Sequence, residues 1–118
     1  MKPVNLADAF AGIQELWKPK IVSAVNDTYV KLVKLKGEFI WHQHEAEDEL
    51  FLVIEGSIRL ELRDGSVSLQ AGEMAVVPQG VEHRPVAEEE AHVLLIEPRS
   101  TRNTGDLRDD RTTEAEWI

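Results

Sequence analysis

The chain has 118 residues, 42% of them hydrophobic, and a formal net charge of −9. This length suits a single domain, which can bury roughly two thirds of the surface of its unfolded chain. The acidic excess argues against duplex nucleic acid and acidic membranes as partners, because both are recognised through a basic face.

The chain contains no cysteine. Disulfides, thiolate metal sites and a cysteine nucleophile are therefore excluded. The first residues, MKPVNLADAFAG, lack an uninterrupted apolar core and carry Asp8 early, so we do not expect a signal peptide. No apolar run approaches the ~20 residues that span a bilayer. We expect a cytoplasmic protein.

The first predicted element is a short helix over residues 5–17. Asn5 can cap its first turn, with Asp8 three residues later, and Pro19 follows its end. Apolar residues recur at helical spacing: Leu6, Phe10, Ile13 and Trp17. We expect this stripe to pack against a sheet; binding of a partner protein is the alternative.

After the helix the apolar pattern changes to a period of two, which predicts short strands. The segments are YVKLVKLKG, LFLVIEG, SIRLELRDG, SVSLQAG, EMAVVPQG and HVLLIEP. Asp64-Gly65 is a strong hairpin signal between two of them. Several short strands with Gly-containing turns are typical of an antiparallel sandwich or barrel.

The tail, residues 99–118, is polar until Trp117 and Ile118. It could be a solvated arm. Alternatively, the terminal apolar pair could dock on its own barrel or on a second subunit.

His42 and His44 are separated by one residue, so in a strand both imidazoles lie on the same face, about 6–7 Å apart. Both could then reach one metal ion, although His-x-His also occurs on solvated strand faces. A carboxylate and a further histidine would strengthen a metal site. Candidates for these are Glu45, Glu47, Asp48 and Glu49, and His83 after a Pro-x-Gly turn.

Two spaced motifs in this order are similar to those of the cupin superfamily of small β-barrels. The first motif consists of Gly37, His42, His44, Glu49 and Gly56. The second consists of Gly72, Pro78, Gly80 and His83. The chain departs from the motifs twice: four residues rather than five separate Gly37 from His42, and Ala87 stands where the second motif has asparagine.

The resemblance implies an all-β fold, a double-stranded β-helix or jelly-roll cupin barrel with a short N-terminal helix. The barrel would span about residues 21–98 of a single domain. The resemblance also implies a divalent transition metal, one of Fe, Mn, Ni, Co, Cu or Zn. Its ligands would be His42, His44, Glu49 and His83. A cupin barrel without metal, or with a purely structural metal, is the alternative.

For function, the resemblance implies a small metal-dependent isomerase, lyase or dioxygenase acting on a small polar metabolite such as a sugar or a carboxylic acid. A non-catalytic metabolite- or sugar-binding module is the alternative. Candidate substrate-binding residues are Lys34, Glu38, Arg84 and His92. His92 alternates with Leu94 and Ile96, and would line the barrel mouth if these residues face inward. We also expect a homodimer, formed through the outer face of one sheet.

Overall fold

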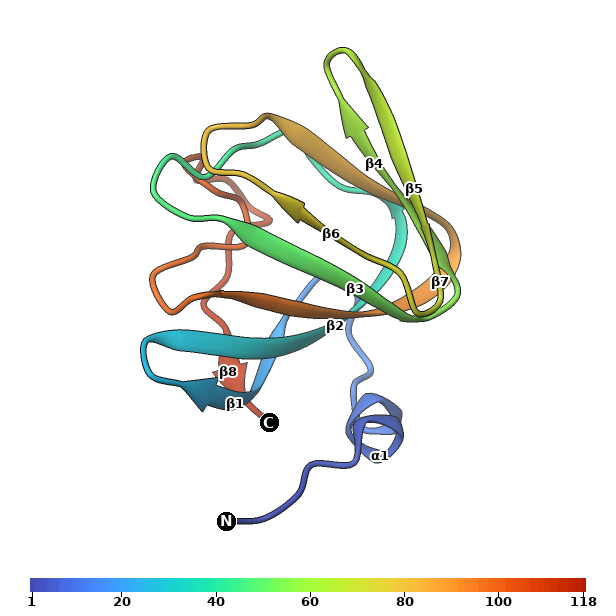
Figure 1. Ribbon diagram of the computed structural model, residues 1–118, viewed down its shortest axis with the longest axis vertical. Helices are drawn as coiled ribbons and strands as arrows, with labels where there is room; N and C mark the ends of the chain where they lie inside the picture. The colour runs from blue at the N-terminus through green and yellow to red at the C-terminus, as the bar shows by residue number, and fades with distance from the viewer.

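The computed structural model describes residues 1–118. It contains one helix and eight strands: α1 (Leu6–Ala11), β1 (Lys20–Val25), β2 (Thr28–Glu38), β3 (Glu49–Glu55), β4 (Ser57–Leu62), β5 (Gly65–Gln70), β6 (Met74–Val77), β7 (His83–Pro98) and β8 (Glu116–Trp117). The strands curve around one interior, with α1 outside them (Figure 1). The expected all-β fold with a short N-terminal helix is confirmed.

β7 is the strand around which the barrel is organised. Its first part pairs with β4, its second part pairs with β3, and β2 runs antiparallel along most of its length. The full path of neighbouring strands is β5-β4-β7-β2-β1-β8, with β6 added on the free side of β3. β7 is longer than the predicted HVLLIEP segment because it already begins at His83. His83 and Glu97 therefore lie on the same strand.

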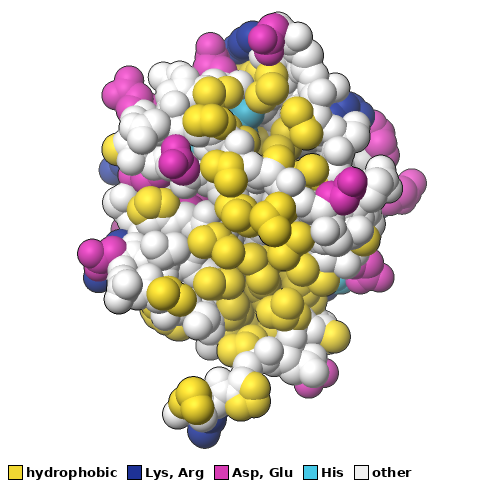
Figure 2. All heavy atoms as spheres, viewed as in Figure 1, with side chains coloured by type: hydrophobic (Ala, Val, Ile, Leu, Met, Phe, Trp, Pro, Cys, Tyr) yellow, Lys and Arg dark blue, Asp and Glu magenta, His cyan; other side chains and the backbone are white.

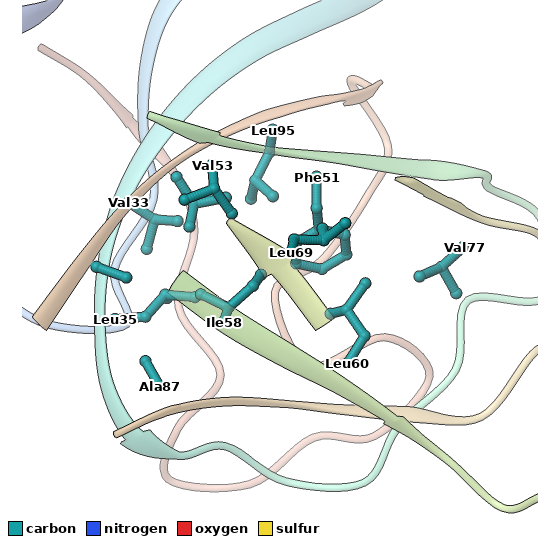
Figure 3. Packing of buried hydrophobic residues seen from close by; sticks show 12 residues of the cluster. Val33, Leu35, Phe51, Val53, Ile58, Leu60, Leu69, Val77, Ala87 and Leu95 are labelled. Carbon is teal, nitrogen blue, oxygen red and sulfur yellow. The ribbon is translucent and has the colours of Figure 1, made fainter. Parts of the chain in front are cut away.

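The interior of the barrel is filled by inward-facing residues of β2, β3, β4, β5, β6 and β7. Twelve buried hydrophobic residues form this cluster, including Phe51, Val53, Leu60 and Leu95 (Figure 3). Ala87, where the family motif has asparagine, belongs to the same cluster and is 1% exposed. A small apolar residue suits this position because a buried amide would need hydrogen-bond partners.

The N-terminal helix is shorter than the predicted 5–17. Asn5 caps it as expected, accepting a hydrogen bond from the Asp8 backbone at 2.9 Å, but the helix ends at Ala11. Gly12 follows, and the chain then extends so that the Trp17 backbone donates to the Lys34 carbonyl at 2.9 Å. Pairing with β2 outweighs the helical periodicity there, and glycine is a poor helix former.

The apolar stripe of α1 packs against the sheet, as predicted. Phe10 and Ile13 are buried in a second cluster with Leu32, Leu94 and Val22. These sheet residues belong to the outer face of the barrel, so α1 covers one end of that face.

The hairpin signal at Asp64-Gly65 is confirmed, with a small shift. β4 and β5 pair from Ser57 and Gln70 to Leu62 and Gly65, which leaves Arg63 and Asp64 as the turn. Gly65 is therefore the first residue of the returning strand.

The rest of the outer face carries an uncovered apolar surface, which we call the outer apolar face. Cross-strand pairing aligns its residues over β6, β3, β7 and β2. They are Met74, Val76, Leu50, Leu52, Ile96 and Val30. Hydrophobic side chains gather on this side of the molecule (Figure 2), and Met74 and Val76 are more than half exposed.

The C-terminal tail docks on its own barrel. β8 pairs in parallel with β1, joining Lys20 to Glu116 and Ile21 to Trp117, and the Ile118 backbone donates to the Ile21 carbonyl at 3.0 Å. The tail is thus not a solvated arm.

The helical part of the chain has neither the length nor the apolar character that a membrane-spanning helix needs.

Candidate metal centre

Two segments far apart in the sequence are joined at the site by reciprocal backbone hydrogen bonds. The His42 backbone donates to the His83 carbonyl at 3.1 Å, and the His83 backbone donates to the His42 carbonyl at 2.9 Å. Beside this bridge, the Gly80 backbone donates to the His44 carbonyl at 2.8 Å. Gly80 has a φ of +79°, which favours glycine. The Pro-x-Gly turn therefore brings His83 to the two N-terminal histidines.

Two of the histidines are fixed in a single tautomer by the backbone carbonyl group two residues before each of them. Nδ1 of His42 lies 2.9 Å from the Ile40 carbonyl oxygen, and Nδ1 of His83 lies 2.9 Å from the Val81 carbonyl oxygen. A carbonyl only accepts, so each Nδ1 carries the proton. In the neutral ring with its proton on Nδ1, Nε2 carries the lone pair, and a metal binds histidine through such a lone pair.

His42, His44, Glu49 and His83 are all buried, and one ligand atom from each lies within 4.8 Å of the others. Oε1 of Glu49 is 3.4 Å from Nε2 of both His44 and His83. These three atoms and Nδ1 of His44 have no hydrogen-bond partner. Buried polar atoms are normally paired, and a transition metal would satisfy three nitrogens and one carboxylate oxygen. These four residues could bind a metal ion.

Burial and the neighbouring His83 lower the pKa of His42 from its ordinary 6.5 to about 4. Its imidazole is therefore neutral at pH 7, and no proton has to be displaced before a metal binds.

Among the four carboxylates after the histidines, Glu49 alone is buried beside them. It begins β3 on the inward face, opposite Val77. Asp48 instead accepts a hydrogen bond from the Gln79 backbone at 2.8 Å, and Glu47 accepts one from the Ser100 hydroxyl at 2.7 Å. Glu45 is exposed.

A buried ion pair adjoins the site and was not anticipated from the sequence. Lys31 Nζ lies 2.9 Å from Glu97 Oε1, and both side chains are less than 5% exposed. A signal was present: Lys31 shares its strand parity with Val33, and Glu97 shares its parity with Leu95, so each occupies a core-facing position. Opposite charges at two such positions predict a buried pair.

Glu97 and Glu49 influence each other's protonation. Burial, and next the Glu49 carboxylate, raise the pKa of Glu97 well above its usual range, although Lys31 acts in the opposite direction. Burial alone would also raise the pKa of Glu49, but the neighbouring side chains of Glu97, His44 and His83 hold it well below the usual range. Of the two carboxyl groups, Glu49 is thus the anionic one, as a metal ligand must be.

A cavity opens beside these groups. One part of its wall is polar and consists of His42, Glu49, Glu97 and Asn103. The remainder consists of Trp17, Pro19, Val33, Leu35, Phe39, Phe51, Pro85 and Leu95. Trp17 and Phe39 stack with ring centroids 4.8 Å apart. The cavity therefore combines four polar residues with apolar, partly aromatic walls.

The structure does not bring Lys34 and His92 to this cavity. Leu94 and Ile96 lie on the outer face, so His92, at the same strand parity, faces outward too. Its ring stacks on Phe10 with centroids 4.7 Å apart. Lys34 is the cross-strand neighbour of His92 and shares that face. The condition under which His92 would line the barrel mouth is therefore not met, because its strand parity is opposite to that of the core residues.

Glu38 and Arg84 also lie outside the cavity. Arg84 follows the inward-facing His83, so its side chain points outward, where its guanidinium group lies 3.1 Å from Glu38 and its Nε donates to Glu61 at 2.8 Å. The same group lies 5.4 Å from the centre of the Trp41 ring. A substrate held in the cavity would therefore not touch these residues.

Comparison with known proteins agrees with this geometry. The family described as "Cupin domain" matches residues 30–97. A cupin-2 domain-containing protein from Shewanella frigidimarina is 47% identical, with a TM-score of 0.80 over 81% of this chain and 94% of its own. Protein NMB1881 from Neisseria meningitidis is 38% identical, with a TM-score of 0.76 over 82% of this chain and 99% of its own.

Among curated proteins, the uncharacterized protein YdbB from Bacillus subtilis is 39% identical over 64 residues, which are 53% of this chain and 57% of that protein. The match thus spans little more than half of that relative. The matched family region contains all four clustered residues, from His42 to His83. The chain belongs to the cupin family.

Proposed function

We propose that this protein is a small metal-dependent enzyme that binds one divalent transition metal through His42, His44, Glu49 and His83. The observation that carries the proposal is the set of buried, unpartnered ligand atoms, beside a cavity that His42 and Glu49 line. A metal there would supply Lewis-acid or redox chemistry, which suits isomerase, lyase or dioxygenase reactions. Candidate metals are Fe, Mn, Ni, Co, Cu and Zn.

The chain's own residues would prepare this site before substrate arrives. His42 and His83 present Nε2 because their Nδ1 protons are held by backbone carbonyls. Glu49 supplies a negative charge that offsets part of the charge of the ion. Glu97 lines the cavity with an Oε2 that has no partner, and its raised pKa would let it hold a proton against a bound substrate.

The cavity wall restricts what the substrate can be. Four of its lining residues are polar, whereas the stacked pair Trp17 and Phe39 forms part of an apolar wall. We propose a small metabolite that offers oxygen atoms at one end and a flat or apolar body at the other. A polyhydroxylated sugar would place its hydroxyl groups against apolar walls without partners, which costs free energy.

The test is elemental analysis of the purified protein, followed by titration with Fe²⁺, Mn²⁺, Ni²⁺ and Zn²⁺ while thermal stability is measured. His44→Ala should lose the metal. His92→Ala is the matched control, because His92 lies on the opposite face of β7, and it should retain the metal. Wild-type protein that contains no metal and gains no stability from any of these ions would reject the proposal. Metal binding without turnover on any small oxygenated compound would favour a non-catalytic binding module.

We also propose that two copies of the chain form a homodimer through the outer apolar face. The exposed side chains of Met74 and Val76 on β6 and of Ile96 on β7 flank Leu50 on β3, which pairs with both strands. Surfaces of this kind on folded proteins mark interaction sites, and a self-complementary face is the usual basis of a two-fold dimer.

A further inference from the structure

We infer that the C-terminal segment Thr101–Asp106 is part of the metal site and that Gly105 is a positioning residue for His42. This inference rests on the proposed function, because it concerns the ligands of the same metal. Its evidence is separate, however, and comes from contacts between this segment and residues 42–44.

Gly105 lies directly against the segment that carries the first two histidines. A Cβ atom added to Gly105 would collide with the carbonyl oxygen of Gln43 and would lie 2.8 Å from its carbonyl carbon and 3.1 Å from Cδ2 of His42. The obstruction is backbone, which cannot rotate out of the way. Any side chain at position 105 must therefore displace the peptide between the two histidine ligands, or the His42 ring.

Three successive residues of the histidine segment are each held by a backbone hydrogen bond from outside that segment. His42 exchanges backbone hydrogen bonds with His83, and the His44 carbonyl accepts from Gly80. Between them, the Gln43 carbonyl accepts from the Asp106 backbone at 2.9 Å. Without Asp106, the Gln43 peptide would be fixed only through its neighbours. The tail thus supplies the central of three restraints on the His-x-His segment.

The C-terminal segment is itself well anchored. Thr104 is fully buried, and its hydroxyl donates to the Leu107 carbonyl at 2.7 Å and lies 2.6 Å from the Thr112 hydroxyl. The Thr101 carbonyl accepts from Lys31 Nζ at 3.4 Å, which ties the segment to the buried pair beside the site.

The same segment also contributes one residue, Asn103, to the cavity wall. Its amide nitrogen donates to the Arg111 carbonyl at 2.8 Å, and its amide oxygen accepts from the Thr113 backbone at 2.9 Å, so its orientation is fixed within the tail. The segment lies beyond residues 30–97, which the cupin family matches. The wall and the restraint on Gln43 are therefore additions to the matched barrel.

The experiment compares Gly105→Ala with Gly72→Ala. Both glycines have positive φ, +63° and +86°, so both substitutions carry a similar backbone cost, but a Cβ at Gly72 meets nothing within 4 Å. Metal affinity is measured by competition with a chelator, and the ligand geometry by the visible absorption bands of the Co²⁺-loaded protein. Unfolding by urea without metal gives the stability of each variant separately.

We expect Gly105→Ala to bind metal roughly 10–100-fold more weakly, as found for residues that orient metal ligands, and to shift the Co²⁺ bands. Gly72→Ala should retain wild-type affinity and spectrum, whatever its loss of stability. Equal affinity and identical spectra in wild type and Gly105→Ala would overturn the inference while leaving the proposed function intact. A wild-type protein that binds no metal would contradict both the inference and the proposed function.

A second variant covers the case in which Gly105→Ala does not fold. Thr104→Val keeps the buried volume but removes the hydroxyl that holds the segment, and should weaken metal binding in the same direction with a smaller change. If Thr104→Val loses stability but binds metal with wild-type affinity, the segment is a structural support only and the inference is wrong.

Discussion

His42 and His83 are 41 positions apart in the sequence, yet their backbones exchange two hydrogen bonds and their ring centroids lie 4.4 Å apart. Because the bridge uses backbone atoms, the side chains remain free to act as ligands. The two motifs are therefore held together before any metal binds, which lowers the conformational-entropy cost of binding.

Replacing His83 by Ala should separate folding from metal binding. The backbone bridge to His42 does not need the imidazole, so we expect the variant to fold. Wild-type protein at a free metal concentration 100 times its Kd should gain about 2.7 kcal/mol in the free energy of unfolding, and the variant should gain almost nothing at that concentration. Urea unfolding with and without Zn²⁺ measures both values; equal gains in the two proteins would mean that His83 is not a ligand.

The metal-free protein should lose stability on acidification between pH 6.5 and about 4. The unfolded chain protonates His42 near its ordinary pKa, whereas the folded protein does so only near 4, so the unfolded state binds more protons in this window. The loss attributable to His42 is at most about 3 kcal/mol.

The comparison with His42→Gln isolates this contribution. Glu97, with its raised pKa, acts with the opposite sign, because its stabilisation is present at low pH and lost as the pH rises through its folded-state pKa. Urea unfolding at several pH values should show a flatter profile for His42→Gln than for wild type in this window. Parallel profiles would contradict the prediction.

Breaking the Lys31–Glu97 pair from one side should be costly. Lys31→Met leaves the buried carboxyl group of Glu97 without its hydrogen-bond partner, and we expect the free energy of unfolding to fall by about 1–3 kcal/mol. The double variant Lys31→Met/Glu97→Leu removes both buried polar groups and should recover most of that loss. A double variant no more stable than the single one would show that Lys31 acts through packing alone.

A charge on the outer apolar face should prevent dimerisation without unfolding the barrel. Val76→Glu places a carboxylate at a position that is already half exposed in the single chain, so burial against a second copy is its main penalty. Sedimentation should show a dimer for wild type and a monomer for Val76→Glu. Val67→Glu is the control, because Val67 is exposed on β5, outside this face, and should remain dimeric. A monomeric wild type would reject the dimer.

Several features followed from the sequence because they depend on local rules. The period-two pattern gave the inward and outward faces of β4, and the hairpin between β4 and β5 followed from Asp64-Gly65. The spacing of the two motifs selected Glu49 among four carboxylates, and the structure places Glu49 beside the histidines.

Other expectations failed where a long-range contact outweighs a local pattern. The helix ends at Ala11 because the chain from Leu16 to Trp17 pairs with β2. His92 would have lined the barrel mouth had Leu94 and Ile96 faced inward, but whether a strand's apolar residues face in or out cannot be decided from alternation when both faces of the sheet are apolar. Here α1 covers outward-facing apolar residues of β2 and β7, so both faces of these strands are apolar and alternation alone was ambiguous.

The sequence by itself determined the family motifs, the ligand types and their order along the chain. Only the tertiary structure decided that Lys31 and Glu97 meet beneath the site, and that Gly105 supports His42 from a polar tail that the sequence left undecided. The physical reason is that motifs record residues whose chemistry is required, whereas these contacts depend on which segments the closed barrel brings within a few ångströms. A collision at Gly105 exists only once Gln43 lies against it.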